Sequence, residues 1–472
     1  MTRPNIVYLH THDAGRAIEP YGFKCRTPNL QRLAEEGVMF RKAFAAAPTC
    51  SPSRAALVTG KYPHNNGMFG LSHREAAGFS LRDYGEHLQN RLKGEGYTTA
   101  LAGIQHIDGP DSEAWEDLER GRRSYGRRIG YDRILNLDDM DGRFRQATMA
   151  AERAAEFVAH VPDQPFFLSV GLMYPHMPFK DFPADGEVIN PNYVQVPATI
   201  PDTPEVRQDL AVYTSKIQHT DQKFGLVLDA VDSAGLADNT IIICTTDHGV
   251  ELPGMKCCLS DAGTGVFLIM RGPGIGTGTV VDKMVTHLDI FPTLCDMLQM
   301  EPPADLQGRS LVPVLEGGES VLHDYIFSEV NYHAAYQPMR AIRGDRWKYI
   351  RRFYNYDKPV FPNQGDTRTK ALLQPILAGV SEPREELYDL LLDPAEQNNM
   401  AGCPETADIE KDMADRLRSW MKATGDPLLD GPITMPEDGL IASMSAANKR
   451  EQRHTGAEWN ELVRKEWRGW QE

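Results

Sequence analysis

The run Thr240-Ile241-Ile242-Ile243-Cys244 is apolar and β-branched, and it directly follows a stretch over 205–234 with helical periodicity. This order, a helix and then a short apolar strand, recurs in two earlier units, 83–93 with 97–103 and 143–160 with 166–173. Repeated units of this kind predict a mainly parallel sheet with helices on both faces. In such a sheet the ligand binds beyond the carboxyl ends of the strands.

The N-terminal segment predicts another strand and helix. Asn5-Ile6-Val7-Tyr8-Leu9 is typical of a buried strand. Thr27 suits the N-cap of the following helix and Pro28 its first position, where the missing proline N–H costs nothing. We expect this helix to bury Leu30, Leu33 and Ala34 and to end at Gly37.

The pattern changes after about residue 335. Arg340 to Arg352 alternates in polarity around a Gly-Asp turn, which predicts an antiparallel hairpin, and a helix is expected over 406–423. We therefore predict three parts: a large α/β domain over 1–335, a smaller C-terminal α+β domain with an antiparallel sheet over 336–424, and an extended strap with a helical tail over 425–472.

The tail concentrates aromatic side chains. Three of the six tryptophans, Trp459, Trp467 and Trp470, lie at roughly helical spacing near its end. Such a stripe would form an exposed apolar patch on an isolated helix. It therefore packs on its own subunit or crosses to a neighbour, and the second alternative predicts a homo-oligomer, either a dimer or a tetramer.

Composition excludes several classes of protein. The 472 residues include 66 acidic and 50 basic side chains, a formal charge of −16, which argues against a nucleic-acid binder or an anionic-membrane binder. No apolar run approaches the roughly 18 residues of a membrane span. Seven scattered cysteines suit a reducing compartment. Because Met1-Thr2-Arg3-Pro4 leads directly into a strand and leaves no room for a signal peptide, we expect a cytoplasmic enzyme.

The stretch Cys50-Ser51-Pro52-Ser53-Arg54-Ala55-Ala56-Leu57-Val58-Thr59-Gly60 predicts a helix that begins at the cysteine. Pro52 favours a helix start, and the free N–H groups there favour an anion beside Cys50. Arg54 lies four residues further on, one turn along the same face, so that it can reach a group built on Cys50.

The pattern Cys-x-Pro-Ser-Arg followed by Thr-Gly resembles the signature of the type I sulfatases of the alkaline phosphatase superfamily. Other segments resemble the same family in order: Asn5 to Asp13, Thr27 to Leu30, Thr246 to Gly249, His287 to Leu294, Leu306 to Leu311, and Glu386 to Asp389 with Asp393-Pro394. The resemblance covers most of residues 4–424. It implies an alkaline-phosphatase-like α/β/α sandwich with the catalytic domain in 1–335. It also implies that a maturation enzyme converts Cys50 to formylglycine, whose hydrate is the nucleophile.

Acidic residues at two predicted strand ends indicate a metal site. Asp13 ends the first strand, and Asp247 with His248 ends a later one, so that they could hold a divalent cation beside Cys50. The family usually has two adjacent aspartates where this chain has His12-Asp13. His12 is therefore a ligand or a nearby hydrogen-bonding group. The resemblance implies calcium, whereas histidine ligands favour manganese or zinc.

Three further residues lie where sulfatases carry catalytic histidines and a lysine. His106 and His176 each follow a predicted strand, and Lys256 follows the second metal loop. The family usually also has a lysine two residues before the first of these histidines, but this chain has Ile104. Arg16 or another cation then supplies the missing contact, or the contact is absent.

The resemblance implies hydrolysis of a sulfate monoester or a sulfamate by the formylglycine hydrate. The segment from His64 to His73 (HNNGMFGLSH) looks closest to the N-sulfoglucosamine sulfohydrolase branch, so we expect a small sulfated substrate, either a sulfated sugar or an aryl sulfate. One alternative is a phosphonate monoester or phosphodiester hydrolase of the same superfamily. A remote alternative is a non-catalytic binder of sulfated sugars.

Overall fold

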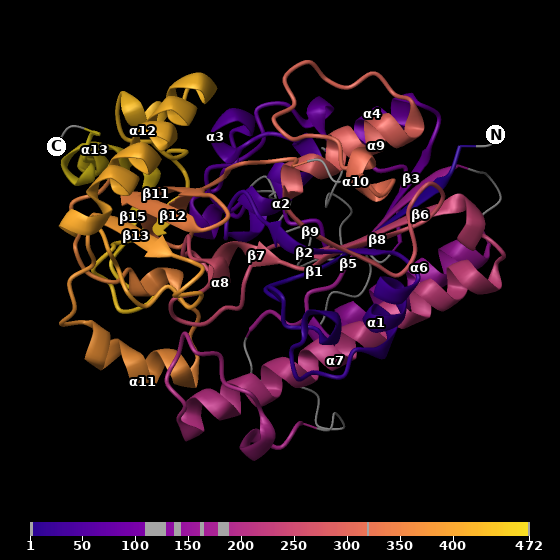
Figure 1. The fold of residues 1–472 in the computed structure, drawn as a ribbon, viewed down its shortest axis with the longest axis horizontal. Coiled ribbons are helices and arrows are strands. Elements are labelled where there is room, and N and C mark those ends of the chain that lie inside the picture. The colour runs from indigo at the N-terminus through magenta and orange to yellow at the C-terminus, as the bar shows by residue number, and fades with distance from the viewer. Residues whose placement is uncertain are drawn as a thin grey trace.

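The computed structural model describes residues 3–108, 129–135, 143–160, 165–177, 188–318 and 321–470. A nine-stranded sheet forms the centre of the larger part, with the order β4-β3-β5-β1-β6-β8-β2-β7 and β9 beside β2 (Figure 1). Its strands are β1 (Asn5–Thr11), β2 (Val38–Phe44), β3 (Thr98–Gly103), β4 (Arg133–Ile134), β5 (Phe166–Gly171), β6 (Thr240–Thr246), β7 (Gly265–Val266), β8 (Leu268–Arg271) and β9 (Thr279–Thr286).

The sheet is mainly parallel, as expected from the repeated helix–strand units. β1 pairs in parallel with both β5 and β6, and β3 pairs in parallel with β4 and β5. The exceptions surround β8, which runs antiparallel to β6 and β2, and β7, which runs antiparallel to β2. β7 and β8 are separated by a single residue and run in the same direction, so both are antiparallel to β2.

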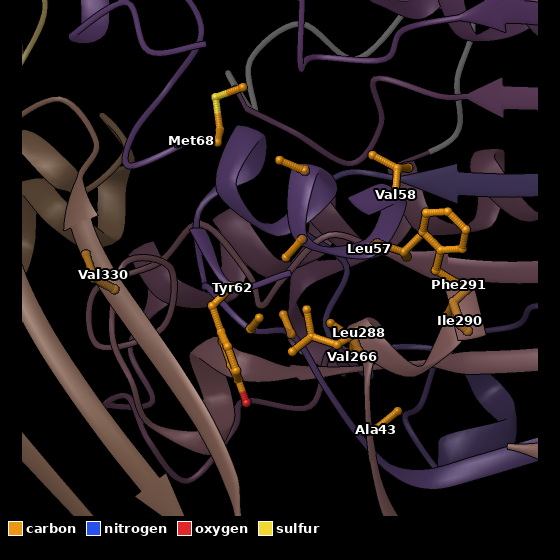
Figure 2. Packing of buried hydrophobic residues seen from close by; sticks show 14 of the residues in the cluster. Ala43, Leu57, Val58, Tyr62, Met68, Val266, Leu288, Ile290, Phe291 and Val330 are labelled. Atoms are coloured by element: carbon orange, nitrogen blue, oxygen red, sulfur yellow. The ribbon is translucent and has the colours of Figure 1, made fainter. Parts of the chain in front are cut away.

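Helices cover both faces of this sheet (Figure 1). The helices described in this part are α1 (Pro28–Glu35), α2 (Cys50–Thr59), α3 (Pro63–Asn66), α4 (Leu88–Gly94), α6 (Arg143–Ala159), α7 (Pro204–Ser233), α8 (Asp261–Thr264), α9 (Ile290–Leu298) and α10 (Val312–Leu315). Along β1, Val7 and Leu9 pack with residues of α1, α6 and α7, whereas Ile6 and Tyr8 belong to the core under α2, α4 and α9. Figure 2 shows part of this second core, where Leu57 and Val58 of α2 lie near Phe291. Alternating side chains of one strand thus reach both cores, which is the α/β/α sandwich.

One expected helix boundary and two expected capping roles need correction, while Thr27 does occupy the N-cap position as predicted. The helix expected over 83–93 begins at Leu88, after a 3₁₀ turn at Tyr84–Glu86, because the side chain of His87 accepts from the N–H of Gln89 and caps the helix there. Thr27 occupies its N-cap position, but its hydroxyl accepts from the N–H of Glu19 instead of capping the helix. Gly37 does not end α1 by a left-handed turn. A Cβ there would lie 2.2 Å from the carbonyl oxygen of Met270, so the glycine permits close strand packing.

The C-terminal part contains an antiparallel sheet in the order β10-β11-β12-β13. Its elements are β10 (Ile326–Tyr332), β11 (Tyr336–Arg343), β12 (Trp347–Arg352), β13 (Glu385–Asp389), α11 (Arg368–Leu377) and α12 (Ala407–Thr424). The hairpin predicted over 340–352 is present, with Gly344 and Asp345 between its strands. The sheet already begins at Ile326, while the exact division of the chain at 335/336 stays a prediction.

The strap and tail fold back onto this second sheet (Figure 1). They contain β14 (Leu440–Ala442), β15 (Arg453–Thr455) and α13 (Gly456–Glu466). Trp459 donates to the hydroxyl of Tyr332 at 3.1 Å, Trp467 donates to the carbonyl of Leu428 at 3.3 Å, and Trp470 stacks against Arg351. All three tryptophans thus contact their own chain, which is the first of the two alternatives, and homo-oligomerisation stays a prediction.

None of the helices in the described segments combines the length and apolar composition of a membrane-spanning helix.

Candidate active site

Two neighbouring strand ends bring the acidic residues together. β1 and β6 are paired in parallel up to Thr11 and Thr246, so that Asp13 and Asp247 emerge at the same edge of the sheet. Oδ1 of Asp247 accepts from the backbone N–H of Asp13 and from that of His248, both at 2.9 Å. One buried carboxylate therefore fixes both loops.

The third contribution to this edge is the N-terminus of α2. Cys50 is the first residue of this helix, as predicted, and its Sγ lies 3.4 Å from Nε2 of His248. One ligand atom from each of Asp13, Cys50, Asp247 and His248 lies within 4.8 Å of the others, and all four residues are buried. Free helix N–H groups favour negative charge at this position.

Arg54 stabilises this arrangement from one turn further along α2. Its Nη2 donates to Oδ2 of Asp247 at 3.0 Å and to the carbonyl of Thr11 at 2.9 Å, while Nη1 contacts Nδ1 of His10. Burial opposes the charge of Asp247, but the Arg54 guanidinium and the neighbouring groups outweigh burial and hold the pKa of this carboxyl well below its usual range. Asp247 is therefore an ionised carboxylate.

The donor set fits a divalent cation. Nδ1 of His248 lies 2.9 Å from the carbonyl of Gly249, which only accepts, so Nδ1 carries the proton. The lone pair of Nε2 then faces Oδ1 of Asp13 at 3.2 Å and Oδ1 of Asp247 at 3.7 Å. Three electron-rich atoms pointing at one another repel unless a positive charge lies between them.

His12 lies beside the same cluster. Its Nδ1 is 3.1 Å from Oδ2 of Asp247, and neither ring nitrogen makes a hydrogen bond with any described residue. The ring is fully buried, and a ligand atom of His12 also groups with those of Asp13, Cys50 and His176. The geometry suits the metal-ligand alternative, and its role stays a prediction.

Lys256 and His176 both lie near the carboxylate of Asp13. Nζ of Lys256 is 3.3 Å from both carboxylate oxygens of Asp13, and Nε2 of His176 is 3.9 Å from Oδ2. Both also contact Glu251, with Oε2 at 3.4 Å from Lys256 and 3.6 Å from His176. Burial opposes the charge of Lys256, but Asp13 and its neighbours raise its pKa well above the usual value. The charged ammonium form of Lys256 is therefore favoured.

His106 lies next to His12, with ring centroids 5.3 Å apart, and its φ of 59° is unusual for a residue other than glycine. Ile104 is buried in the position where the family carries lysine. Arg16 does not replace that lysine: its guanidinium donates to the carbonyl of Ala43 and stacks on Phe44.

Several residues of the site carried no sequence signal. Glu251 lies in the loop after β6 and belongs to no recognisable motif. His10 contacts Arg54 from within β1, a strand that the sequence indicated only as buried and apolar. Ser53 donates to the carbonyl of Asp247 at 2.5 Å and contacts His287. The alternation of β1 could have indicated His10, since it shares the face of Tyr8, and Ser53 belongs to the Cys-x-Pro-Ser-Arg signature although no role was expected for it, whereas Glu251 is defined only by tertiary contacts.

Comparisons with known proteins agree with these motifs. A family model described as Sulfatase matches residues 4–300, and one described as N-sulphoglucosamine sulphohydrolase, C-terminal, matches residues 256–363. The N-sulphoglucosamine sulphohydrolase of Homo sapiens is 28% identical over 92% of this chain and 93% of its own length. An ulvan-active sulfatase of Formosa agariphila is 28% identical over 92% of this chain and 83% of its own length.

Solved structures share the fold. A 2-O GAG sulfatase superimposes with a TM-score of 0.71 at 21% identity, covering 95% of this chain and 99% of that one. A phosphonate monoester hydrolase of Agrobacterium radiobacter gives a TM-score of 0.65 at 23% identity, covering 89% and 96% of the two chains.

Proposed function

Because this chain belongs to the sulfatase family, we propose that it hydrolyses a sulfate monoester or a sulfamate through a formylglycine hydrate formed at position 50. The observation that carries this proposal is the placement of Cys50: it begins α2 and lies within 4.8 Å of two carboxylates and His248. The helix N-terminus and Lys256 would stabilise the oxyanion of a formylglycine hydrate at this position.

The chemistry follows from the hydrate being a geminal diol. One hydroxyl, as its oxyanion, attacks sulfur in line with the leaving group, and Arg54 and Lys256 supply positive charge to the oxyanion and the sulfuryl oxygens. His176 protonates the leaving oxygen or nitrogen. His106 then takes the proton of the second hydroxyl, the C–O bond to sulfate breaks, and the aldehyde is restored. A serine or cysteine without the second hydroxyl would stay sulfated.

A divalent cation bound by Asp13, Asp247, His248 and the residue at position 50, with His12 as a further candidate ligand, would supply Lewis-acid stabilisation of the nucleophile and the sulfuryl oxygens. The mixture of carboxylate and imidazole donors favours manganese or zinc more than an all-oxygen site would, while the family resemblance favours calcium.

Mass spectrometry of the peptide containing Cys50 tests the nucleophile directly. Conversion of cysteine to formylglycine lowers the peptide mass by about 18 Da. The chain should be coexpressed with a formylglycine-generating enzyme, the maturation partner that the proposal requires. Unmodified Cys50 in a preparation that still hydrolyses sulfate esters would contradict the mechanism.

The substrate we propose is a sulfated or N-sulfated sugar. The support is the match of residues 256–363 to the C-terminal model of N-sulphoglucosamine sulphohydrolase, together with the human relative of that name. Assays with N-sulfoglucosamine and 4-nitrophenyl sulfate test it, and turnover of the aryl ester alone would remove the sugar from the proposal. Parallel rates on a phosphonate monoester of the same phenol test the phosphonate alternative.

A further inference from the structure

Two buried polar side chains beside the catalytic groups have hydrogen-bonding capacity that the mechanism does not use. Glu251 is 6% exposed; its Oε2 lies 3.4 Å from Nζ of Lys256 and 3.6 Å from Nε2 of His176, but it makes no well-oriented hydrogen bond with the described residues. His333 is 8% exposed, and its Nδ1 has no hydrogen-bond partner among them. Leaving buried polar atoms unpaired lowers stability, so an unused atom beside an active site is available to hydrogen-bond a ligand.

These two side chains come from different parts of the fold. Glu251 follows β6 in the large α/β part, whereas His333 lies in the connection between β10 and β11 of the antiparallel sheet. Each lies within electrostatic reach of the other, and His333 is also within reach of Lys256 and His248. The second sheet therefore extends a loop to the edge of the catalytic cluster.

The segment 363–365 ties the two together. Asn363 accepts from the N–H of Ala335, two residues after His333, at 2.7 Å. Gly365 packs directly on Glu251: a Cβ at this glycine would lie 2.8 Å from Cγ of the glutamate. Between them, Gln364 has a buried Oε1 that also makes no hydrogen bond with any described residue.

The polar atoms of Glu251, His333 and Gln364 are suited to binding hydroxyl groups. A carboxylate and an amide oxygen only accept hydrogen bonds. Burial and the charge of Lys256 outweigh Glu251 and lower the pKa of His333 well below its usual value, so that its neutral ring offers one donor and one acceptor. Such a set suits neutral O–H or N–H groups and disfavours a second anion close to Glu251.

We propose that His333, with Glu251 and Gln364, forms a recognition subsite for hydroxyl or amine groups on the carbon skeleton next to the sulfuryl group, so that the second domain selects a sugar over an aryl ester. This inference rests on the proposed sulfatase function and names the residues that choose its substrate. Hydrogen-bonding sites discriminate strongly against analogues that lack the group, because their buried polar atoms are then left unpaired.

The test compares two substrates in one variant. His333→Phe keeps a ring of similar size and removes the polar atoms. We expect kcat/KM for N-sulfoglucosamine to fall about ten- to hundredfold, mainly through KM, because one or two buried hydrogen bonds are lost. For 4-nitrophenyl sulfate, which has no such groups, we expect a change below about threefold. His160→Phe, at the exposed end of α6, is the matched control and should change neither.

A second variant and a binding measurement separate the possible failures. Gln364→Met, nearly isosteric and partly exposed, should give the same selectivity with a smaller loss if His333→Phe does not fold. Equal losses on both substrates, or a wild-type enzyme that turns over only the aryl ester, would overturn the inference and leave the sulfatase function intact. If neither ester is hydrolysed, the proposed function fails. In that case, calorimetric titration of N-sulfoglucosamine tests the subsite by binding alone. The Kd of the Cys50→Ala variant is compared with that of Cys50→Ala/His333→Phe, and an unchanged Kd refutes the subsite.

Discussion

Replacing Asp426 with alanine should destabilise the protein through one buried ion pair between the strap and the second sheet. Arg340, on β11, is fully buried, and its Nε and Nη2 donate to the two carboxylate oxygens of Asp426 at 2.5 and 2.9 Å. Nη1 donates to Asn331 and to the carbonyls of Val330 and Met339. The guanidinium thus keeps three of its partners when the carboxylate is lost, but it loses the carboxylate that is hydrogen-bonded to it, and the electrostatic effect of Glu329 is then the largest that still favours its charge.

The magnitude follows from the loss of that hydrogen-bonded carboxylate. Breaking a buried pair by removing one partner costs about 3–5 kcal/mol, whereas replacing both partners with apolar residues is often close to neutral. Asp426→Ala should therefore lower the free energy of unfolding by about 3–5 kcal/mol. The double variant Asp426→Leu/Arg340→Met should recover most of the loss. Asp412→Ala, in the half-exposed pair with Arg416, is the control and should have no measurable effect.

The ion pair also predicts a pH dependence. Burial opposes the charge of Asp426, but Arg340 outweighs it and lowers the pKa below the usual value. The stabilisation is complete above the unfolded pKa, about 4, and is lost as the pH falls through the lower, folded value. Urea denaturation between pH 3 and pH 7, at roughly constant ionic strength, measures this difference between wild type and Asp426→Ala. A single-variant loss below about 1 kcal/mol at neutral pH would refute the reasoning, since it would mean that water reaches the guanidinium.

The remaining predictions concern the site and the tail. Cys50→Ala should abolish turnover with an unchanged unfolding curve, and steady-state activity within about tenfold of wild type would exclude a formylglycine nucleophile. Asp247→Ala should remove the bound cation and most activity, as measured by elemental analysis and assay, while a mild effect of His12→Ala would assign His12 to a supporting role. Trp459→Ala should lower the free energy of unfolding by about 3–5 kcal/mol in the same urea assay, because this side chain is 3% exposed within its own chain. Light scattering of a chain lacking 455–472 tests separately whether the tail also holds subunits together.

Periodicity and local chemistry determined much of the framework. The apolar run at 240–244 and the helix before it correspond to β6 and α7, and Asn5 to Leu9 begins β1, because a strand buried on both faces has few alternatives. The start of a helix at Cys50 could also be predicted from the sequence, since the proline and the small residues after Cys50 favour a helix N-terminus. The sulfatase family, inferred from the motifs, is confirmed by the family model over 4–300.

Only the tertiary structure decided which groups meet. Glu251 and His333 are 82 positions apart with no shared motif, and their approach depends on how the antiparallel sheet docks beside the strand ends. The partner of Arg340 lies in the strap, and the tail tryptophans find theirs on the second sheet. The sequence determines local conformation because a turn or a strand depends on adjacent residues, whereas a pairing between distant residues depends on packing energies summed over the whole core.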